Sequence, residues 1–490
     1  MAEVAVDERR LLKTIRWWDG FVIGLANPGF LLIALWGSII ALGGKWAIAL
    51  FVVSAIIGAL QAYIYCEPAA MFPDKPGGLS VYAREGWRKH FSFAGPIAVF
   101  GYWFAWSSVL AINGFVIGTL AQAQWFSDTT FTQDVGNFQW NLPVWIGIGC
   151  IIAVWLFNIY GVRPAVWLAY LTGGLLILPA AVLMFLPYIT GDWSSDNMTW
   201  AIGSGGGLGL ALTWLYFMGW SAYGFETVAA FAPEYHNPEY DTPRALRASA
   251  AFSVVVYALL PLGIGGTLGT DAIAKDATAI AFYTDGFDAI VGSTLTHFLV
   301  VCLIAGLLLS MNTATMDGSR ALYGISQDGM TTKLLGRLNR YSVPAIAMTA
   351  DVILNLFLIS YFGYPLDILA AGNLGYMLAH VFALTGFLLL RRDRPNWPRP
   401  IKLSAAWVPI AGLLAAVNLL FIVTGAFIYA DKYGYGWDKT WIGIGVLAVG
   451  LLLYIWRRVV EDRTGVPLRE ETPTMPPDTA SAAPTATPAV

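Results

Sequence analysis

The residues of this sequence that could do chemistry gather in one apolar stretch, residues 214–243. Gly219 and Gly224 lie in its middle, and the carboxylic acid Glu226 follows the second glycine two positions later. An ionisable side chain at membrane depth usually has a function, and non-helical backbone is tolerated there only where it lines a cavity. A carboxyl in this position could bind and release a proton. The alternatives are a structural salt bridge and a glycine-kinked packing helix.

A second interruption lies in the first apolar stretch, where Asn27-Pro28-Gly29 is a turn sequence. Pro28 lacks a backbone donor and clashes with the preceding helical turn, so the helix should break there. We therefore predict non-helical backbone at residues 26–29 and again at residues 220–223, with the two breaks facing each other. Paired interruptions in the two halves of a chain indicate the binding site of a solute carrier, whereas a lone proline kink is a common packing feature.

The composition indicates an all-α integral membrane protein. Of its 490 residues 57% are hydrophobic and only 12% are charged, which excludes an ordinary soluble domain. The three cysteines and four histidines have no ligand-like spacing, so we expect no disulfide framework, metal site or cofactor. The zinc-protease, serine-hydrolase and phosphate-loop patterns do not occur, so we expect no enzyme.

Apolar stretches of about 20 residues recur along the chain and predict twelve transmembrane helices. We place them at residues 17–42, 46–71, 93–123, 143–161, 165–189, 206–232, 246–269, 288–319, 343–362, 366–390, 404–430 and 440–457.

The distribution of positive charge supports this count and predicts the orientation. With both termini in the cytoplasm, cytoplasmic segments hold all 28 lysines and arginines except Lys45, Lys275, Lys432 and Lys439. Cytoplasmic loops of membrane proteins carry such an excess of basic residues. We expect the protein in the cell membrane (plasma or inner membrane).

Several motifs together resemble the amino acid–polyamine–organocation (APC) superfamily. The stretch after residue 217 is similar to the sixth helix of that family. In this stretch the matching residues are Trp220, Ser221, Gly224-Phe225-Glu226, Asn237-Pro238 and Pro243-Arg244. The other matching motifs are residues 67–82, 319–323, 328–330, Leu335, Pro344, 390–392, Pro395 and Arg399-Pro400.

The resemblance implies the leucine-transporter fold. That fold has two inverted five-helix repeats, here residues 17–189 and 206–390, followed by two further helices within residues 404–457. Helices 1 and 6 are interrupted. Residues 1–16 would be a cytoplasmic N-terminal segment, and residues 470–490, rich in Pro, Ala and Thr, a disordered cytoplasmic tail.

The resemblance also implies a permease that moves amino acids or related small amines by alternating access. A polyamine or organic amine exchanger, a substrate sensor and a channel of the same fold stay open as alternatives. The expected partners are this small molecule, the lipid bilayer and protons, but not nucleic acid.

The implied substrate site lies between the interrupted helices, with Trp220 as an aromatic that stacks on or gates the substrate. Because Pro28 has no N–H where the family usually has glycine, a substrate carboxylate would rely on Gly29, Phe30 and the Asn27 amide. The full expected set is Ala26, Asn27, Gly29, Phe30, Trp103, Trp220, Ser221, Tyr223 and Gly224.

The coupling ion is less well defined by the sequence. Glu226 is the candidate for proton coupling or gating, since it resembles an acid near the family's inner gate. Ser310 and Thr313 could contribute to a sodium site, although hydroxyls in membrane helices more often join helices. Trp106, Tyr376 and His380 could line the cavity or simply pack, and the acid Asp351 needs a partner that the sequence does not identify.

Overall fold

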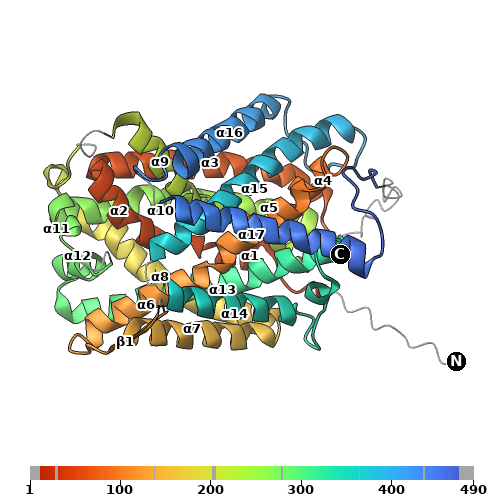
Figure 1. The fold of residues 1–490 in the computed structure, drawn as a ribbon. Coiled ribbons are helices and arrows are strands. Elements are labelled where there is room, and N and C mark those ends of the chain that lie inside the picture. Colours follow the sequence, from red (N-terminus) through yellow and green to blue (C-terminus); the bar gives the residue numbers. More distant parts are fainter. Residues whose placement is uncertain are drawn as a thin grey trace, which may run out of the picture.

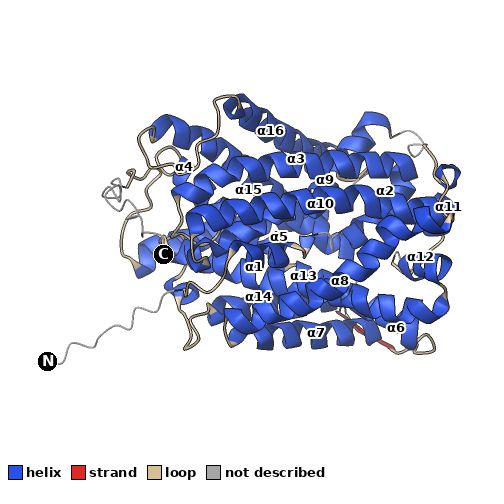
Figure 2. Ribbon diagram, turned by 180° about the vertical axis from the view of Figure 1, so that it is seen from behind, coloured by secondary structure: helices blue, strands red, loops and turns tan. Residues whose placement is uncertain are grey.

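The computed structural model describes residues 11–27, 31–136, 138–200, 206–276, 280–362, 365–433 and 436–473. Most of this part of the chain is helical (Figures 1 and 2). Nine helices of the described residues are long and apolar enough to cross a membrane, and the shorter helix 345–361 is also apolar. The prediction of an all-α integral membrane protein is confirmed to this extent.

The first half of the chain begins with two short helices in one apolar stretch, α1 (Trp17–Gly24) and α2 (Leu31–Leu42). The elements that follow are α3 (Gly44–Met71), α4 (Leu79–Trp87), α5 (Ala94–Ser107), α6 (Val109–Trp125), the antiparallel hairpin β1 (Thr132–Val135) and β2 (Phe138–Asn141), α7 (Leu142–Ile159) and α8 (Val162–Thr190).

The second half begins with α9 (Gly207–Ala222), which continues as a 3₁₀ segment, η3 (Gly224–Glu234). The elements that follow are α10 (Pro238–Leu268), α11 (Thr270–Ala274), α12 (Phe282–Val291), α13 (Ser293–Gln327), α14 (Ala345–Tyr361), α15 (Pro365–Asp393), α16 (Trp407–Ile422) and α17 (Trp437–Trp456). Shorter 3₁₀ and π-type turns are η2 (Ser195–Asn197), η4 (Lys333–Gly336), η5 (Val423–Ile428) and η6 (Arg457–Glu461).

One expectation about the backbone is wrong for three of its four residues. Residues 220–222 are α-helical, because α9 runs to Ala222 and the Tyr223 amide still donates to the Gly219 carbonyl at 3.1 Å. A glycine weakens a helix without removing a donor, so the α-helical pattern survives past Gly219. Only Tyr223 of the predicted interval lies outside the α-helix, and the 3₁₀ segment begins at Gly224.

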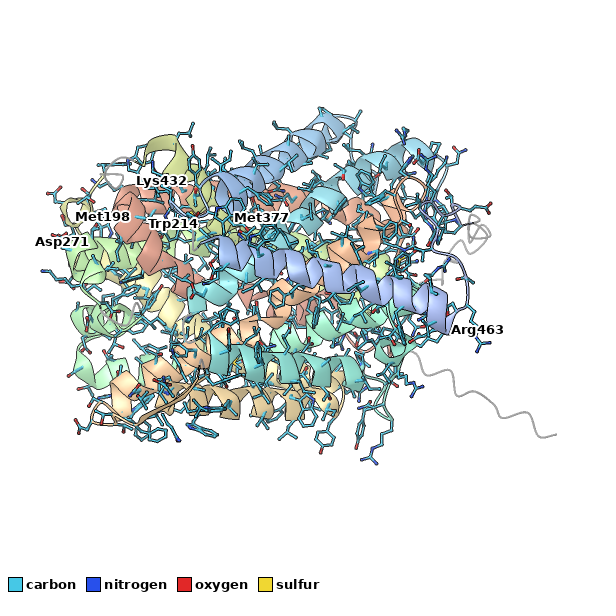
Figure 3. All side chains as sticks on the ribbon, in the orientation of Figure 1. Met198, Trp214, Asp271, Met377, Lys432 and Arg463 are labelled. Carbon is cyan, nitrogen blue, oxygen red and sulfur yellow. The ribbon has the colours of Figure 1, made fainter. Side chains whose placement is uncertain are left out.

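The two ends of the bundle differ. The helix α4 lies at one end, whereas α11, α12 and β1 lie at the other (Figure 1). Asp271 and Arg463 mark these opposite ends in the view with side chains (Figure 3). We call the first the α4 end of the bundle.

Small residues let the central helices approach closely. A methyl group at Gly101 of α5 would overlap the backbone of Gly375 in α15, and one at Gly86 of α4 would overlap Gly386. The helix α15 therefore packs directly on both α4 and α5. In the interior, α1 contacts η3 and α2 contacts α9, so the two segments with helix ends lie side by side.

Candidate functional site

The helix ends of α1 and α9 meet at one hydroxyl, that of Tyr257 on α10. This hydroxyl lies 3.2 Å from the Asn27 carbonyl oxygen and 3.1 Å from the Ser221 hydroxyl, and it is also hydrogen-bonded to the Ser221 carbonyl. The Asn27 amide donates to the Ser253 hydroxyl at 3.2 Å. All four side chains are buried. Main-chain groups freed by two helix ends thus converge in the centre of the bundle.

Hydroxyls of α13 hold the carbonyls at the end of α1. Ser310 donates to the Ala26 carbonyl at 2.8 Å, and Thr313 donates to the Ile23 carbonyl at 3.1 Å. The Ile23 carbonyl also accepts from the Ala26 amide at 3.2 Å, so the hydroxyl of Thr313 adds a second hydrogen bond to it. The two proposed sodium ligands therefore contact the end of α1 directly.

The structure brings together only part of the expected substrate site. Ala26, Asn27 and Ser221 converge as described, and Trp220 is 3% exposed in the last turn of α9. The Tyr223 hydroxyl instead donates to Asn418 of α16 at 3.2 Å, so it faces the opposite side of α9. Gly224 begins the 3₁₀ segment. Gly29 and Phe30 lie outside the described residues.

Trp103 of α5 contacts a buried acid. Its indole donates to Asp351 of α14 at 2.5 Å, which gives this acid the partner that the sequence left open. Asn355, one turn further along α14, accepts from the Ala111 amide at 3.0 Å and donates to Ser107 at 3.0 Å. These two polar residues hold the α5–α6 junction, away from the ends of α1 and α9.

Glu226 is buried, with 1% of its surface exposed, and its donors are neutral. One carboxyl oxygen accepts from the Tyr376 hydroxyl at 2.8 Å and from the Trp106 indole at 3.3 Å. The other oxygen has no hydrogen-bond partner. Ion pairs between described residues do not include Glu226. The salt-bridge alternative therefore has no support from this geometry.

Ion pairs at the α4 end join the sequence motifs. Arg320 forms a two-pronged pair with Glu234, and its guanidinium lies over the Phe231 ring at 4.8 Å. The backbone amides of Thr14 and Ile15 donate to the Glu234 carbonyl at 2.9 and 3.1 Å. The chain before α1 is thus fixed to the end of η3, and both are fixed to α13.

A second ionic cluster at this end surrounds Glu67 of α3. Its carboxylate pairs with Arg391 and, at 3.1 Å, with Arg399, and it accepts from the Leu403 amide at 2.9 Å. Residues from the motifs after the second and tenth predicted spans therefore contact each other directly. The sequence resemblance named these motifs but could not show that they pair.

A third cluster centres on Glu85 of α4. Its carboxylate pairs with Arg394 at 2.6 Å, Lys75 at 2.8 Å and Arg88 at 3.3 Å. Burial raises the pKa of Glu85, but the three cations lower it further, so the pKa falls from 4.5 to about 2. This carboxylate therefore stabilises the packing of α4 only while it is ionised.

We expect Glu85→Gln to lower the thermal unfolding midpoint at neutral pH. Because the folded-state pKa is depressed, the stabilisation is present above the unfolded-state value of 4.5 and is lost as the pH falls through about 2. The pKa difference corresponds to about 3 kcal/mol. Thermal unfolding in detergent between about pH 6 and about pH 2 should show a fall in the midpoint of the wild type that is absent from the variant. The exposed Asp128→Asn is the control, and equal pH dependence in wild type and Glu85→Gln would contradict the assignment.

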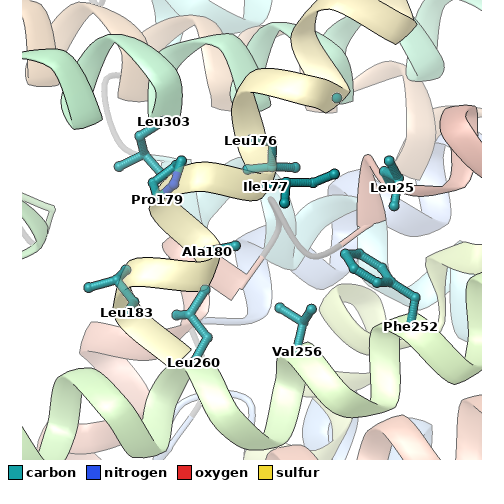
Figure 4. A pocket seen from close by; sticks show the side chains of 11 residues that line it. Leu25, Leu176, Ile177, Pro179, Ala180, Leu183, Phe252, Val256, Leu260 and Leu303 are labelled. Carbon is teal, nitrogen blue, oxygen red and sulfur yellow. The ribbon is translucent and has the colours of Figure 1, made fainter. Parts of the chain in front are cut away.

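An apolar crevice lies beside the end of α1 (Figure 4). Leu25, Leu176 and Ile177 face it from one side, and Phe252 and Val256 of α10 from another. None of the described side chains that line it is polar, so they offer no partner for an ammonium or carboxylate group. The crevice is therefore a poor candidate for an amino acid site, in contrast to the polar junction at Tyr257.

Comparison with known proteins defines the class to which this architecture belongs. The profile of a family described as amino acid permease matches residues 16–453. The chain therefore belongs to the amino acid permease family, within the APC superfamily that its motifs resemble. This confirms the recognition made from the motifs of the sixth, second, eighth and tenth spans.

Individual relatives differ in the substrate that their names give. A lysine-specific permease of Escherichia coli is 24% identical, over 86% of this chain and 90% of the relative. A branched-chain amino acid permease of Lactococcus lactis is 26% identical, over only 46% of this chain and 47% of the relative. A polyamine transporter of Oryza sativa is 26% identical, over 87% of this chain and 75% of the relative.

The sequence analysis missed two polar residues of the centre, Tyr257 and Asp317. Both lie within long apolar helices, α10 and α13, and both are buried. For Asp317 the sequence did contain a signal, because a lone acid in an apolar span usually marks a functional position. Trp106 and Tyr376 were named as candidates for the cavity, and the structure places both against Glu226.

Proposed function

We propose that this protein is a secondary active transporter for amino acids or related small amines, working by alternating access. The observation that carries the proposal is the meeting of the α1 and α9 ends at Tyr257. Helix ends leave main-chain groups free to bind a solute, and they are tolerated in a membrane where they line a cavity. Family membership supports the same class of function.

The substrate would lie between the helix ends and be held at both of its charged groups. Carbonyls near the C-terminal ends of α1 and α9 suit an ammonium group, because that end of a helix carries partial negative charge. The first amides of α2 suit a carboxylate. Lysine, branched-chain amino acids and polyamines, the compounds in the names of these relatives, all contain an amine. We therefore expect every substrate to carry this group.

The remaining architecture follows from the sequence argument. We propose twelve spans in the 5+5 inverted arrangement with helices 1 and 6 interrupted, and both termini in the cytoplasm. The α4 end, rich in arginine ion pairs, would then face the cytoplasm, in agreement with the positive charge of inner loops. A cell-membrane location fits a permease of this kind.

A ligand screen on the purified protein tests the proposal and defines the substrate. Amino acids, amines and polyamines would each be added, and the thermal unfolding midpoint recorded. A ligand that binds only the folded state stabilises it by about 2.7 kcal/mol at a hundred times its Kd. We expect stabilisation by one class of primary amine. No stabilisation by any of these compounds would contradict the proposal.

We expect Trp220→Ala to weaken substrate binding about tenfold or more. A cation over a tryptophan face gains roughly 0.5–2 kcal/mol, and the side chain also supplies contact area. Titration of the ligand found in the screen measures the loss, with Trp167→Ala as a control because that tryptophan is 76% exposed. Unchanged affinity with normal folding would show that Trp220 only packs.

We expect uptake to continue when potassium replaces sodium. The Ile23 and Ala26 carbonyls accept hydrogen bonds from Thr313 and Ser310, and a sodium ion bound here would require both hydroxyl protons to turn away from these carbonyls. Initial uptake rates in the two salts measure the effect. A stimulation by sodium that Thr313→Val removes would instead assign these hydroxyls to a sodium site.

A further inference from the structure

A second buried acid, Asp317, lies close to Glu226. It belongs to α13, and its surface is fully buried. One carboxyl oxygen accepts from the Tyr102 hydroxyl at 3.0 Å, and the other has no hydrogen-bond partner. The Asp317 carboxyl is near enough to Glu226 to interact with it electrostatically. It played no part in the sequence analysis or in the proposed substrate site.

Two tyrosines connect the acids. Tyr102 donates to Asp317 and Tyr376 donates to Glu226, and the centres of the two rings are 6.2 Å apart. Each carboxyl therefore has one oxygen held by a neutral phenol and one oxygen left over. The hydroxyl of Thr227, next to Glu226 in the chain, is also buried and lies close enough to the Asp317 carboxyl to interact with it. Thr227 thus places the two acids in one small buried cluster.

No cation among the described residues forms an ion pair with this cluster, although Arg320 acts on Asp317 from a distance. Arg320, one turn along α13, directs its guanidinium to Glu234 and to the Met316 carbonyl. From α14, Asp351 approaches Gly318 and adds a third acid rather than a base. From α15, His380 packs on the Tyr376 ring at 4.8 Å, and its Nδ1 is hydrogen-bonded to the Tyr65 hydroxyl at 2.9 Å. The acids are therefore surrounded by phenols, an indole and further acid.

We propose that Asp317 and Glu226 form one proton-binding pair that carries the coupling proton during transport. This inference rests on the proposed transport function and assigns a second residue to its coupling. Two carboxylates in a dry interior repel each other strongly, and a shared proton removes that repulsion. The proton binds a free carboxylate oxygen from water on one side of the membrane and returns to water on the other side. No other bond is made or broken.

A pair of this kind titrates as a unit, so its two members should not act additively. Reconstituted protein would be assayed for counterflow, which needs no net proton movement, and for accumulation driven by a pH gradient. Each pH unit should give the wild type about tenfold accumulation per coupled proton. We expect Asp317→Asn to lose this accumulation, Glu226→Gln to lose it equally, and the double variant to be no worse than either single variant.

Two further variants make the test specific. Asp317→Glu keeps a carboxyl and should retain coupling, and Asp351→Asn removes a neighbouring buried acid outside the pair and should also retain it. If Asp317→Asn does not fold, Tyr102→Phe provides the test. This variant loses the hydrogen bond to Asp317 and must therefore move the pH profile of uptake. Gradient-driven accumulation by Asp317→Asn, or an unmoved profile in Tyr102→Phe, overturns the proposal. Absence of counterflow in the wild type would instead overturn the proposed transport function.

Discussion

Glu226→Gln is expected to make substrate uptake independent of pH between about pH 5 and about pH 8 and to abolish accumulation driven by a pH gradient. Glutamine keeps the size of the side chain and its carbonyl acceptor, so the hydrogen bonds from Tyr376 and Trp106 can persist. It cannot take up a proton. Burying an unpaired charge is costly, and proton binding to the carboxylate removes that cost. Uptake into proteoliposomes at several pH values measures the effect.

The size of this effect is set by the gradient. One pH unit drives about tenfold accumulation for each coupled proton, and the variant should only equilibrate its substrate. Substrate binding to Glu226→Gln should remain measurable in the thermal unfolding assay, because no described contact joins Glu226 to the Tyr257 junction. If Glu226→Gln keeps the pH profile of the wild type, a role for Glu226 in proton coupling is contradicted. Exchange of one substrate for another would then be the favoured mechanism.

The largest loss of stability is expected for Arg320→Ala. The substitution leaves Glu234, 2% exposed, as a buried charge without its two-pronged partner. Removing one partner of a buried pair typically destabilises a protein by about 3–5 kcal/mol. The substitution also breaks the contact that joins α13 to η3 and, through Glu234, to the segment before α1. The α4 end should therefore open more readily. Thermal unfolding in detergent and the labelling rate of a cysteine introduced at the α4 end measure the two effects.

A matched pair of variants separates charge burial from lost packing. Arg340→Ala removes an arginine that is exposed, so it should leave stability within about 0.5 kcal/mol of the wild type. The double variant Arg320→Met with Glu234→Gln removes both charges and should recover much of the stability lost in Arg320→Ala. If Arg320→Ala unfolds at the wild-type midpoint, the pair has no structural role.

Nine of the twelve predicted spans coincide with described helices that are long and apolar enough to cross a membrane, because hydrophobicity over about 20 residues is a local property. The turn sequence at Asn27-Pro28 lies between the observed end of α1 and start of α2 for an equally local reason, since proline lacks a donor. The expectation at Trp220 and Ser221 failed because a glycine only weakens a helix. Whether the helix continues then depends on contacts with other helices.

The polar partners within the site could not be predicted in the same way. Tyr257 reaches Asn27 across 230 positions of the chain, and Tyr102 reaches Asp317 across 215. Each is an isolated polar residue in an apolar helix, and periodicity does not show which neighbour it will contact. Trp103 illustrates the difficulty, because its partner is Asp351 rather than a group at the helix ends.

Counterflow tests the central claim, that a carrier moves an amine-bearing solute through a site between the α1 and α9 ends. Proteoliposomes would be loaded with the unlabelled ligand from the screen and diluted into a trace of labelled ligand. We predict a transient, saturable accumulation of label in the wild type and its loss in Ser221→Trp, which puts a bulky side chain at the junction with Tyr257. Label that only equilibrates without saturation would indicate a channel, and no entry above protein-free liposomes would indicate a sensor. Either result would contradict the account.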